Sequence, residues 1–129
     1  MIGKSRRVPD RIQDMLEAIG NVASDLGNMS KEDFLADGKT QRAVIESLIV
    51  LGEAANKILQ LDPAIQQTAP TLWQQFRDSY DMRIVLTHEY FRVDAAIVWT
   101  TVKENLPILE AQLVEFASRS KPAPPAPGQ

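Results

Sequence analysis

Apolar residues recur at three- and four-residue intervals along most of the chain, the spacing that places them on one face of an α-helix. The first such stretch begins at Pro9 or Asp10, because proline suits the first helical turn and an acidic side chain complements the helix dipole there. It ends at Gly27. Its apolar face is formed by Ile12, Met15, Leu16, Ile19, Val22, Ala23 and Leu26. Ser30, followed by Asp33, gives a weak capping signal for a short helix over residues 31–36.

A second long helix is predicted over residues 40–59, where apolar positions spread around much of the helix surface. They are Ala43, Val44, Ile45, Leu48, Ile49, Val50, Leu51, Ala55 and Ile58. A helix with so wide an apolar face is expected to be covered on two sides. Glu53 and Lys57 form an i,i+4 pair that adds a little helix stability. The dipeptide Asp62-Pro63 marks a loop, and residues 63–70 are predicted to be a loose connection.

The rest of the pattern predicts a third helix from Pro70 to about Thr87, with room for a break, and a fourth that starts after Asp94 as its N-cap. Pro107 predicts a kink or restart, followed by an amphipathic stretch to Phe116. No β-type alternation persists. We therefore expect an all-α fold, an up-and-down bundle of four to five helices in one domain over residues 1–117. The Pro-rich tail, residues 118–129, is predicted to be disordered.

Composition narrows the possible chemistry. The chain has 129 residues, the length of a typical single domain. It has no cysteine. Its single histidine, His88, excludes a zinc site built from several imidazoles of one chain. The net charge is −3, so nucleic-acid binding through a general basic surface is not expected. Any RNA contact must come from a local group of arginines.

The pattern contains no signal for export or membrane insertion. The N-terminal residues MIGKSRRVPDRI are basic but have no apolar segment behind them. Apolar runs such as residues 48–51 are far shorter than the ~18 residues needed to cross a bilayer. We therefore expect a soluble, cytoplasmic protein with no membrane partner.

The segment from Asp81 to Arg92 departs from ordinary bundle patterning. On a helix, Met82, Val85 and Leu86 point together and are expected to face the core. A second stripe holds Arg83, Thr87 and Tyr90, and a third holds Asp81, Ile84 and His88. Arg83 and His88 are then roughly 140° apart around a regular helix. They converge only if Arg83 reaches across, if the helix ends near His88, or if a second subunit completes the site.

An arginine, a histidine and a tyrosine without metal ligands suit metal-free cleavage of RNA. Imidazole can accept or donate a proton near neutral pH, and a guanidinium offers a fixed fork of donors to a phosphate. His88 would deprotonate the ribose 2′-OH while Arg83 holds the scissile phosphate, which gives a 2′,3′-cyclic phosphate and a 5′-OH. A second proton donor is needed for the leaving oxygen, and the His88 of a dimer partner is the candidate.

The ordinary structural interpretation stands beside this one. A lone histidine near a helix end is usually a cap or a solvated side chain, and an aromatic residue such as Tyr90 more often belongs to a core or an interface. Asp81 and Thr87 are more typical of a helix surface than of a catalytic site. With Glu89 and Arg92 they are candidate supporting residues only.

The motif Arg83-x4-His88-x-Tyr90 resembles the hallmark of the HepT family, part of the HEPN group of helical domains. The surroundings are also similar to that family: LGEAANKI at residues 51–58, the Val93-Asp94 pair, Trp99, and Asn105-Leu106-Pro107-Ile108-Leu109. The resemblance covers residues 8–117. One position departs from the pattern, because HEPN motifs often carry a polar residue directly after the arginine and this chain has Ile84.

The resemblance implies the toxin of a type VII toxin–antitoxin system, a dimeric, metal-independent endoribonuclease with Arg83 and His88 as catalytic residues. Its partner would be a minimal nucleotidyltransferase of the MntA type, which transfers AMP from ATP to the tyrosine of the motif, here Tyr90. A phosphodiester anion two residues from His88 would compete for Arg83 and keep RNA out. The antitoxin would use ATP and Mg²⁺. No cofactor is expected for this chain, and no DNA substrate.

Two other functions remain open at this point. The chain could be a catalytically inactive helical partner that binds a nucleotidyltransferase as a scaffold or substrate-binding subunit, which Ile84 and the acidic pI of about 5.1 favour. It could also be a plain dimeric bundle without chemistry. A homodimer is predicted from the single histidine and from the wide apolar faces of the second and fourth helices.

Overall fold

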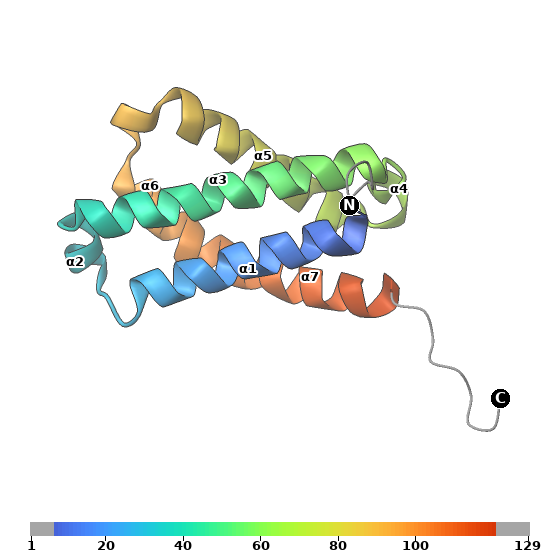
Figure 1. Cartoon of the computed structure of the whole chain (residues 1–129), viewed down its shortest axis with the longest axis horizontal. Helices are drawn as coiled ribbons and strands as arrows, with labels where there is room; N and C mark the ends of the chain where they lie inside the picture. The colour runs from blue at the N-terminus through green and yellow to red at the C-terminus, as the bar shows by residue number, and fades with distance from the viewer. Residues whose placement is uncertain (1–6, 121–129) are drawn as a thin grey trace, which may run out of the picture.

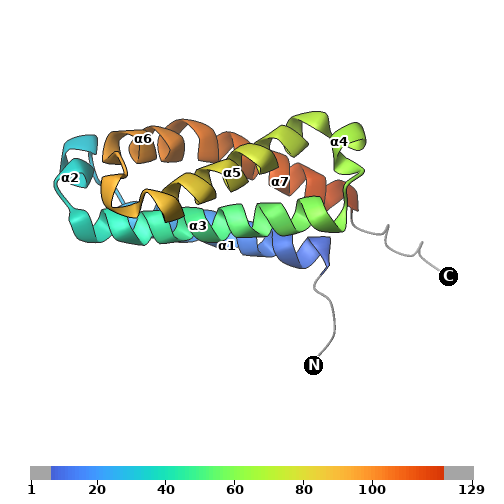
Figure 2. The ribbon, with the colours of Figure 1, turned by 90° about the horizontal axis from the view of Figure 1, so that it is seen from above.

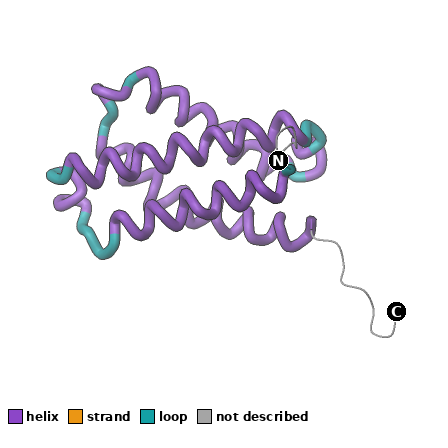
Figure 3. Tube along the Cα trace, in the orientation of Figure 1, coloured by secondary structure: helices purple, strands orange, loops and turns teal. Residues whose placement is uncertain are grey.

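The computed structural model describes residues 7–120, and all regular structure in that range is helical (Figure 3). The elements, in chain order, are α1 (Val8–Leu26), α2 (Lys31–Leu35), α3 (Gly38–Leu61), α4 (Ile65–Thr68), α5 (Pro70–His88), a 3₁₀ turn (Tyr90–Arg92), α6 (Ala95–Thr100), a π-helical turn (Thr101–Asn105) and α7 (Leu106–Ser120). The predicted all-α bundle is confirmed. In the described range, no helix is both long and apolar enough to cross a membrane.

The long helices lie side by side along one axis, with α3 between α1 and α5 (Figures 1 and 2). The expectation that the helix in this region is covered on two sides is therefore confirmed. The core runs between these helices and α7, and its largest fully enclosed side chains are Met15, Phe34, Val44, Ile58, Ile65, Phe76, Leu86, Val98 and Leu113. Burial of this apolar surface is the main stabilising term of such a bundle.

Helix boundaries follow the predicted capping residues. The Ser30 hydroxyl accepts a hydrogen bond from the Asp33 N–H at 3.1 Å, and the Asp94 carboxylate accepts one from the Ala96 N–H at 2.9 Å. Gly27 ends α1 at a positive φ of 53°, a backbone conformation that glycine adopts without a steric penalty. These contacts explain why the sequence pattern located the ends of the first helices within a few residues.

The restart expected at Pro107 is present as a change of helix type. The π-helical turn spans Thr101–Asn105, and the Leu106 N–H donates to the Thr101 carbonyl five residues back. Proline at 107 has no N–H, so the regular hydrogen-bond register of the helix cannot continue through it. The wider π-helical turn accommodates the missing hydrogen bond, so α6, this turn and α7 follow one another without an intervening loop.

Three expectations need correction or extension. Residues 63–70 are not a loose connection throughout, because Ile65 is buried and anchors the short helix α4. The break that the pattern allowed in α5 is absent, since the helix runs unbroken to His88. At the C-terminus, α7 continues to Ser120, three residues beyond the predicted end of the domain, and residues 121–129 of the predicted tail lie outside the described range.

The N-cap of α3 gives a pH-dependent contribution to stability. The Asp37 carboxylate accepts hydrogen bonds from the Thr40 backbone N–H at 3.1 Å and from the Thr40 hydroxyl at 3.0 Å. These bonds favour the charged form and lower the pKa of Asp37 below its ordinary value of 3.8. A lowered pKa adds stability above the unfolded-state pKa, and this stability is lost as the pH falls through the folded-state pKa.

We therefore expect Asp37→Ala to lower the melting temperature at pH 7 and to differ less and less from the wild type as the pH falls below 4. Asp37→Asn is the control, because asparagine caps a helix well but does not titrate. Melting followed by circular dichroism from pH 7 to pH 2.5 checks this. An Asp37→Ala deficit of constant size across that range would contradict the capping role.

Candidate functional site

The C-terminal half of α5 carries Arg83 and His88 and ends at the second of them. The helix stays regular to its end, where the Glu89 N–H donates to the Val85 carbonyl at 2.8 Å. His88 is exposed on the last turn. The helix does end at His88, one of the three conditions considered for convergence, but this alone does not bring Arg83 and His88 together.

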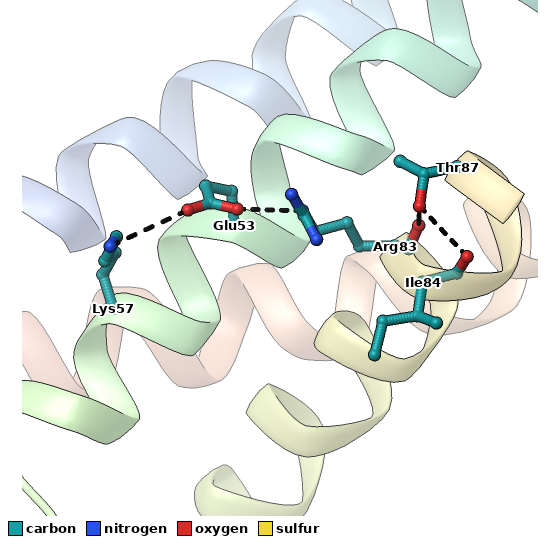
Figure 4. Close-up of polar contacts among 5 residues, drawn as sticks. All are labelled: Glu53, Lys57, Arg83, Ile84 and Thr87. Carbon is teal, nitrogen blue, oxygen red and sulfur yellow. Dashed lines mark hydrogen bonds and ion pairs between the residues drawn. The ribbon is translucent and has the colours of Figure 1, made fainter.

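Arg83 reaches sideways from α5 onto α3 (Figure 4). Its Nε lies 2.9 Å from Oε2 of Glu53, and Oε1 of the same carboxylate lies 4.0 Å from Nζ of Lys57. The Arg83 Nε–H is enclosed and does not point at the carboxylate oxygen, so the contact is an ion pair without hydrogen-bond geometry. The carboxylate thus lies between two cations, and the three groups together carry one net positive charge.

The direction of Arg83 separates it from His88. Five residues of regular helix place the two side chains roughly 140° apart around the axis and about 7.5 Å apart along it. Arg83 points toward α3 and α1, whereas His88 is on the free end of α5, which stands away from α3 because α5 crosses that helix obliquely (Figure 1). The two groups therefore line different parts of the surface of one subunit.

An open groove of about 390 Å³ runs along α3 beside Arg83. Arg11 and Asp14 of α1 form its opposite wall, and Glu53 lies between the walls. Its apolar floor comes from Ile49, Val50 and Ala54. Arg83 thus keeps contact with solvent, with 31% of its side chain exposed. An anion that enters this groove meets a guanidinium already held in place.

Tyr90 follows the helix end in the 3₁₀ turn and is 40% exposed. Thr87 and Asp81, which the sequence offered as candidate supporting residues, make contacts within their own helix. The Thr87 hydroxyl is directed at its own helix, 3.0 Å from the Arg83 carbonyl and 3.1 Å from the Ile84 carbonyl. Asp81 pairs with Arg77 one turn earlier, at 3.5 Å.

Glu89 and Arg92 are both exposed. They contact each other through the backbone, where the Arg92 N–H donates a hydrogen bond to the Glu89 carbonyl at 2.7 Å. They are near His88 and Tyr90 in sequence, but within residues 7–120 no hydrogen bond or ion pair joins either of them to Arg83. Across residues 7–120, no three carboxylate or imidazole side chains gather in the way that holds a metal ion.

The expectation that Val85 faces the core is wrong. Leu86 is buried and Met82 packs partly against the core, but Val85 is 53% exposed and Ile84 is 36% exposed. The oblique course of α5 is the reason, because the last turns of the helix move away from α3 and expose a side that the periodicity assigned to the core. An apolar surface therefore lies directly beside the motif.

Sequence reasoning missed Glu53 as a member of this site. The helical spacing predicted only that Glu53 pairs with Lys57 four residues later, and the structure confirms this ion pair. Its contact with Arg83 joins residues 30 positions apart, which a helical period cannot reveal. The available signal was the GEA segment at residues 52–54, part of the stretch LGEAANKI whose family resemblance was noted without a role for its glutamate.

The all-helical bundle is consistent with the HEPN-like fold that the sequence resemblance implied. The model of the ribonuclease HepT-like family matches residues 12–116. The chain belongs to the ribonuclease HepT-like family.

Curated relatives give the same assignment. The chain is 37% identical over 103 residues to a protein of Thermococcus cleftensis named as a probable ribonuclease HepT, covering 80% of this chain and 89% of that one. A protein of Methanocaldococcus jannaschii named as a putative RNase is 32% identical over 101 residues, covering 78% and 79%. Another named so, from Caldanaerobacter subterraneus, is 33% identical over 93 residues, covering 72% and 79%. No solved structure matches the chain.

Proposed function

We propose that the chain is a metal-independent endoribonuclease that acts in the cytoplasm as the toxin of a type VII toxin–antitoxin system. The observation that carries this proposal is the placement of Arg83 and an exposed His88 on the last turns of α5, in a chain of a ribonuclease family. RNA is the substrate because the proposed chemistry uses its 2′-hydroxyl, which DNA lacks. The chain itself needs no cofactor.

The reaction is a transfer of the phosphodiester to the neighbouring ribose oxygen. His88 accepts the 2′-OH proton, the 2′ oxygen attacks phosphorus, and the bond to the 5′ oxygen breaks. The products are a 2′,3′-cyclic phosphate and a 5′-OH. Arg83 stabilises the negative charge that develops on the phosphate, because its terminal nitrogens carry four donors besides the enclosed Nε–H.

A homodimer supplies what one subunit lacks. The leaving 5′ oxygen needs a proton and the chain has one histidine. Regular helix geometry also turns Arg83 and His88 of one subunit in different directions. In a dimer, His88 of a second copy can act as the acid, and the two copies together can surround one phosphodiester. Ile84 and Val85, consecutive residues on the last turns of α5, are 36% and 53% exposed, and this apolar surface supports an interface at this end of the bundle.

Tyr90 is the proposed acceptor of AMP from a cognate nucleotidyltransferase, which would bring ATP and Mg²⁺. Its exposure on the 3₁₀ turn, two residues after His88, supports this role because a partner enzyme must reach the phenol oxygen. An added phosphodiester would place a negative charge beside His88 and compete with RNA for the cations of the site.

One observation favours a second function, that of a catalytically inactive subunit. Arg83 is already paired with Glu53, and the position after it is the apolar Ile84. A catalytically inactive subunit that binds a nucleotidyltransferase as a scaffold is consistent with an arginine that is already ion-paired. It would bind the partner tightly but would not cut RNA.

Cleavage of RNA by the purified chain in EDTA separates the two functions. The ribonuclease proposal predicts cleavage that EDTA does not reduce, because both proton transfers use imidazole and no metal-bound water. The scaffold predicts intact RNA at every enzyme concentration. A cleavage activity that EDTA abolishes would contradict the metal-independent reaction.

A further inference from the structure

We propose that Gly52 and Glu53 act together as positioning residues for Arg83, Gly52 fixing the base of its side chain and Glu53 its guanidinium. This deepens the proposed ribonuclease function and, where it concerns catalysis, rests on it. It also gives a role to the GEA segment of α3, which the reaction described above does not use.

The backbones of α3 and α5 approach each other very closely at Gly52. A Cβ atom built at this position would lie 2.5 Å from the Arg83 Cβ and 2.5 Å from the Ser79 carbonyl oxygen. Real Cβ atoms essentially never come within 3.0 Å of such neighbours. Glycine inside a helix is unfavourable relative to alanine, so its presence here calls for a packing reason, and this contact supplies one.

The contact determines where the arginine begins. Because the backbone of α3 touches the Arg83 Cβ, the side chain must leave α5 along the surface of α3. The next residue of α3, Glu53, then meets the guanidinium 2.9 Å from its Nε. Arg83 is held at both ends of its flexible chain by two consecutive residues of one helix.

Glu53 holds Arg83 by its Nε edge. The enclosed atom is Nε, while the side chain as a whole stays 31% exposed, so the exposed part belongs to other atoms. A guanidinium restrained at Nε keeps the donors of its two terminal nitrogens for a phosphate. Lys57 at the other carboxylate oxygen keeps the local charge positive, so the pair does not cancel the attraction for an anion.

Stability alone does not explain the pair. The side chains of Arg83 and Glu53 are 31% and 40% exposed, and ion pairs at that exposure contribute little to folding. Their effect on geometry is larger, because a catalytic group displaced by about 1 Å can lose roughly a hundredfold in rate. The pair is therefore better explained by orientation of Arg83 than by stabilisation of the bundle.

The first test uses NMR of the arginine Nε–H groups and needs no activity. Arg83→Lys assigns the Arg83 signal by its disappearance. In the wild type we expect this proton to exchange slowly with water because Nε is enclosed. In Glu53→Gln and in Gly52→Ala the guanidinium is no longer held in its enclosed position, so we expect the proton to shift and to exchange at least about tenfold faster. The matched controls are Glu46→Gln, an exposed carboxylate of α3, and Gly20→Ala, a helical glycine with nothing within 4 Å of a built Cβ. An unchanged Arg83 signal in Glu53→Gln would overturn the proposal.

The second test uses catalysis and a double-mutant cycle. Glu53→Gln is expected to lower kcat/KM for RNA by about tenfold to a hundredfold while its melting temperature stays that of the wild type. In an Arg83→Ala background the same change is expected to have no further effect. An equal loss in both backgrounds would assign Glu53 a role independent of Arg83 and overturn the proposal. If the wild type cuts no RNA, the function proposed above fails, and the NMR test alone decides the positioning role.

Discussion

Replacement of His88 by alanine is expected to lower the rate of RNA cleavage by roughly 10²- to 10⁴-fold. The chain has one histidine, so no other side chain of the same type can take over the proton transfers. In the proposed dimer the loss removes both the base and the acid, because both are copies of His88. Single-turnover cleavage of a defined RNA in EDTA measures the effect.

The fold of the His88→Ala variant should be unchanged, because the side chain is exposed on the last turn of α5. Circular dichroism and the melting temperature check this. Added imidazole should restore part of the lost rate, since a small base can occupy the solvent-accessible position that the side chain has left. Full cleavage by the variant would remove His88 from the mechanism.

Tyr90→Phe is expected to abolish silencing by the nucleotidyltransferase while RNA cleavage stays close to that of the wild type. The phenol oxygen is the proposed acceptor, and phenylalanine keeps the ring but offers no oxygen to modify. Incubation with the partner, ATP and Mg²⁺, followed by intact-protein mass measurement, should show addition of AMP to the wild type and none to the variant.

Tyr80→Phe is the matched control, since Tyr80 is the chain's other tyrosine and lies on α5 with its ring beside the Arg77 guanidinium. This variant should accept AMP as the wild type does and lose its ribonuclease activity when modified. Addition of AMP to Tyr90→Phe would show that the acceptor lies elsewhere. Cleavage that persists after Tyr90 is modified would contradict silencing by charge at the site.

Local signals explain why the helices were predictable. Ser30 and Asp94 accept hydrogen bonds from backbone N–H groups three and two residues ahead, so their effect is contained within a few residues of sequence. The same holds for Pro107, whose missing N–H predicts an interruption in its own helix. The sequence could not give the form of that interruption, because a π turn and a kink satisfy the same local constraint.

Tertiary packing explains the features that the sequence pattern predicted wrongly or did not predict. The exposure of Val85 depends on the angle at which α5 crosses α3, and the short helix α4 depends on a core site that buries Ile65. The pairing of Glu53 with Arg83 depends on a close contact between two helices at a glycine. None of these is encoded in a period of three or four residues. The motif residues were identifiable from the sequence, but the residues that orient them required the packed bundle.

The central claim is that Arg83 and His88 cleave RNA through its own 2′-hydroxyl without a metal ion. The most direct measurement compares, in EDTA, a short RNA with the same RNA carrying a single 2′-deoxy residue at the mapped cleavage site. The account predicts that the first is cut to 2′,3′-cyclic phosphate and 5′-OH ends and that the second is left intact at that bond. Equal cleavage of both, or products with a 5′-phosphate, would contradict it.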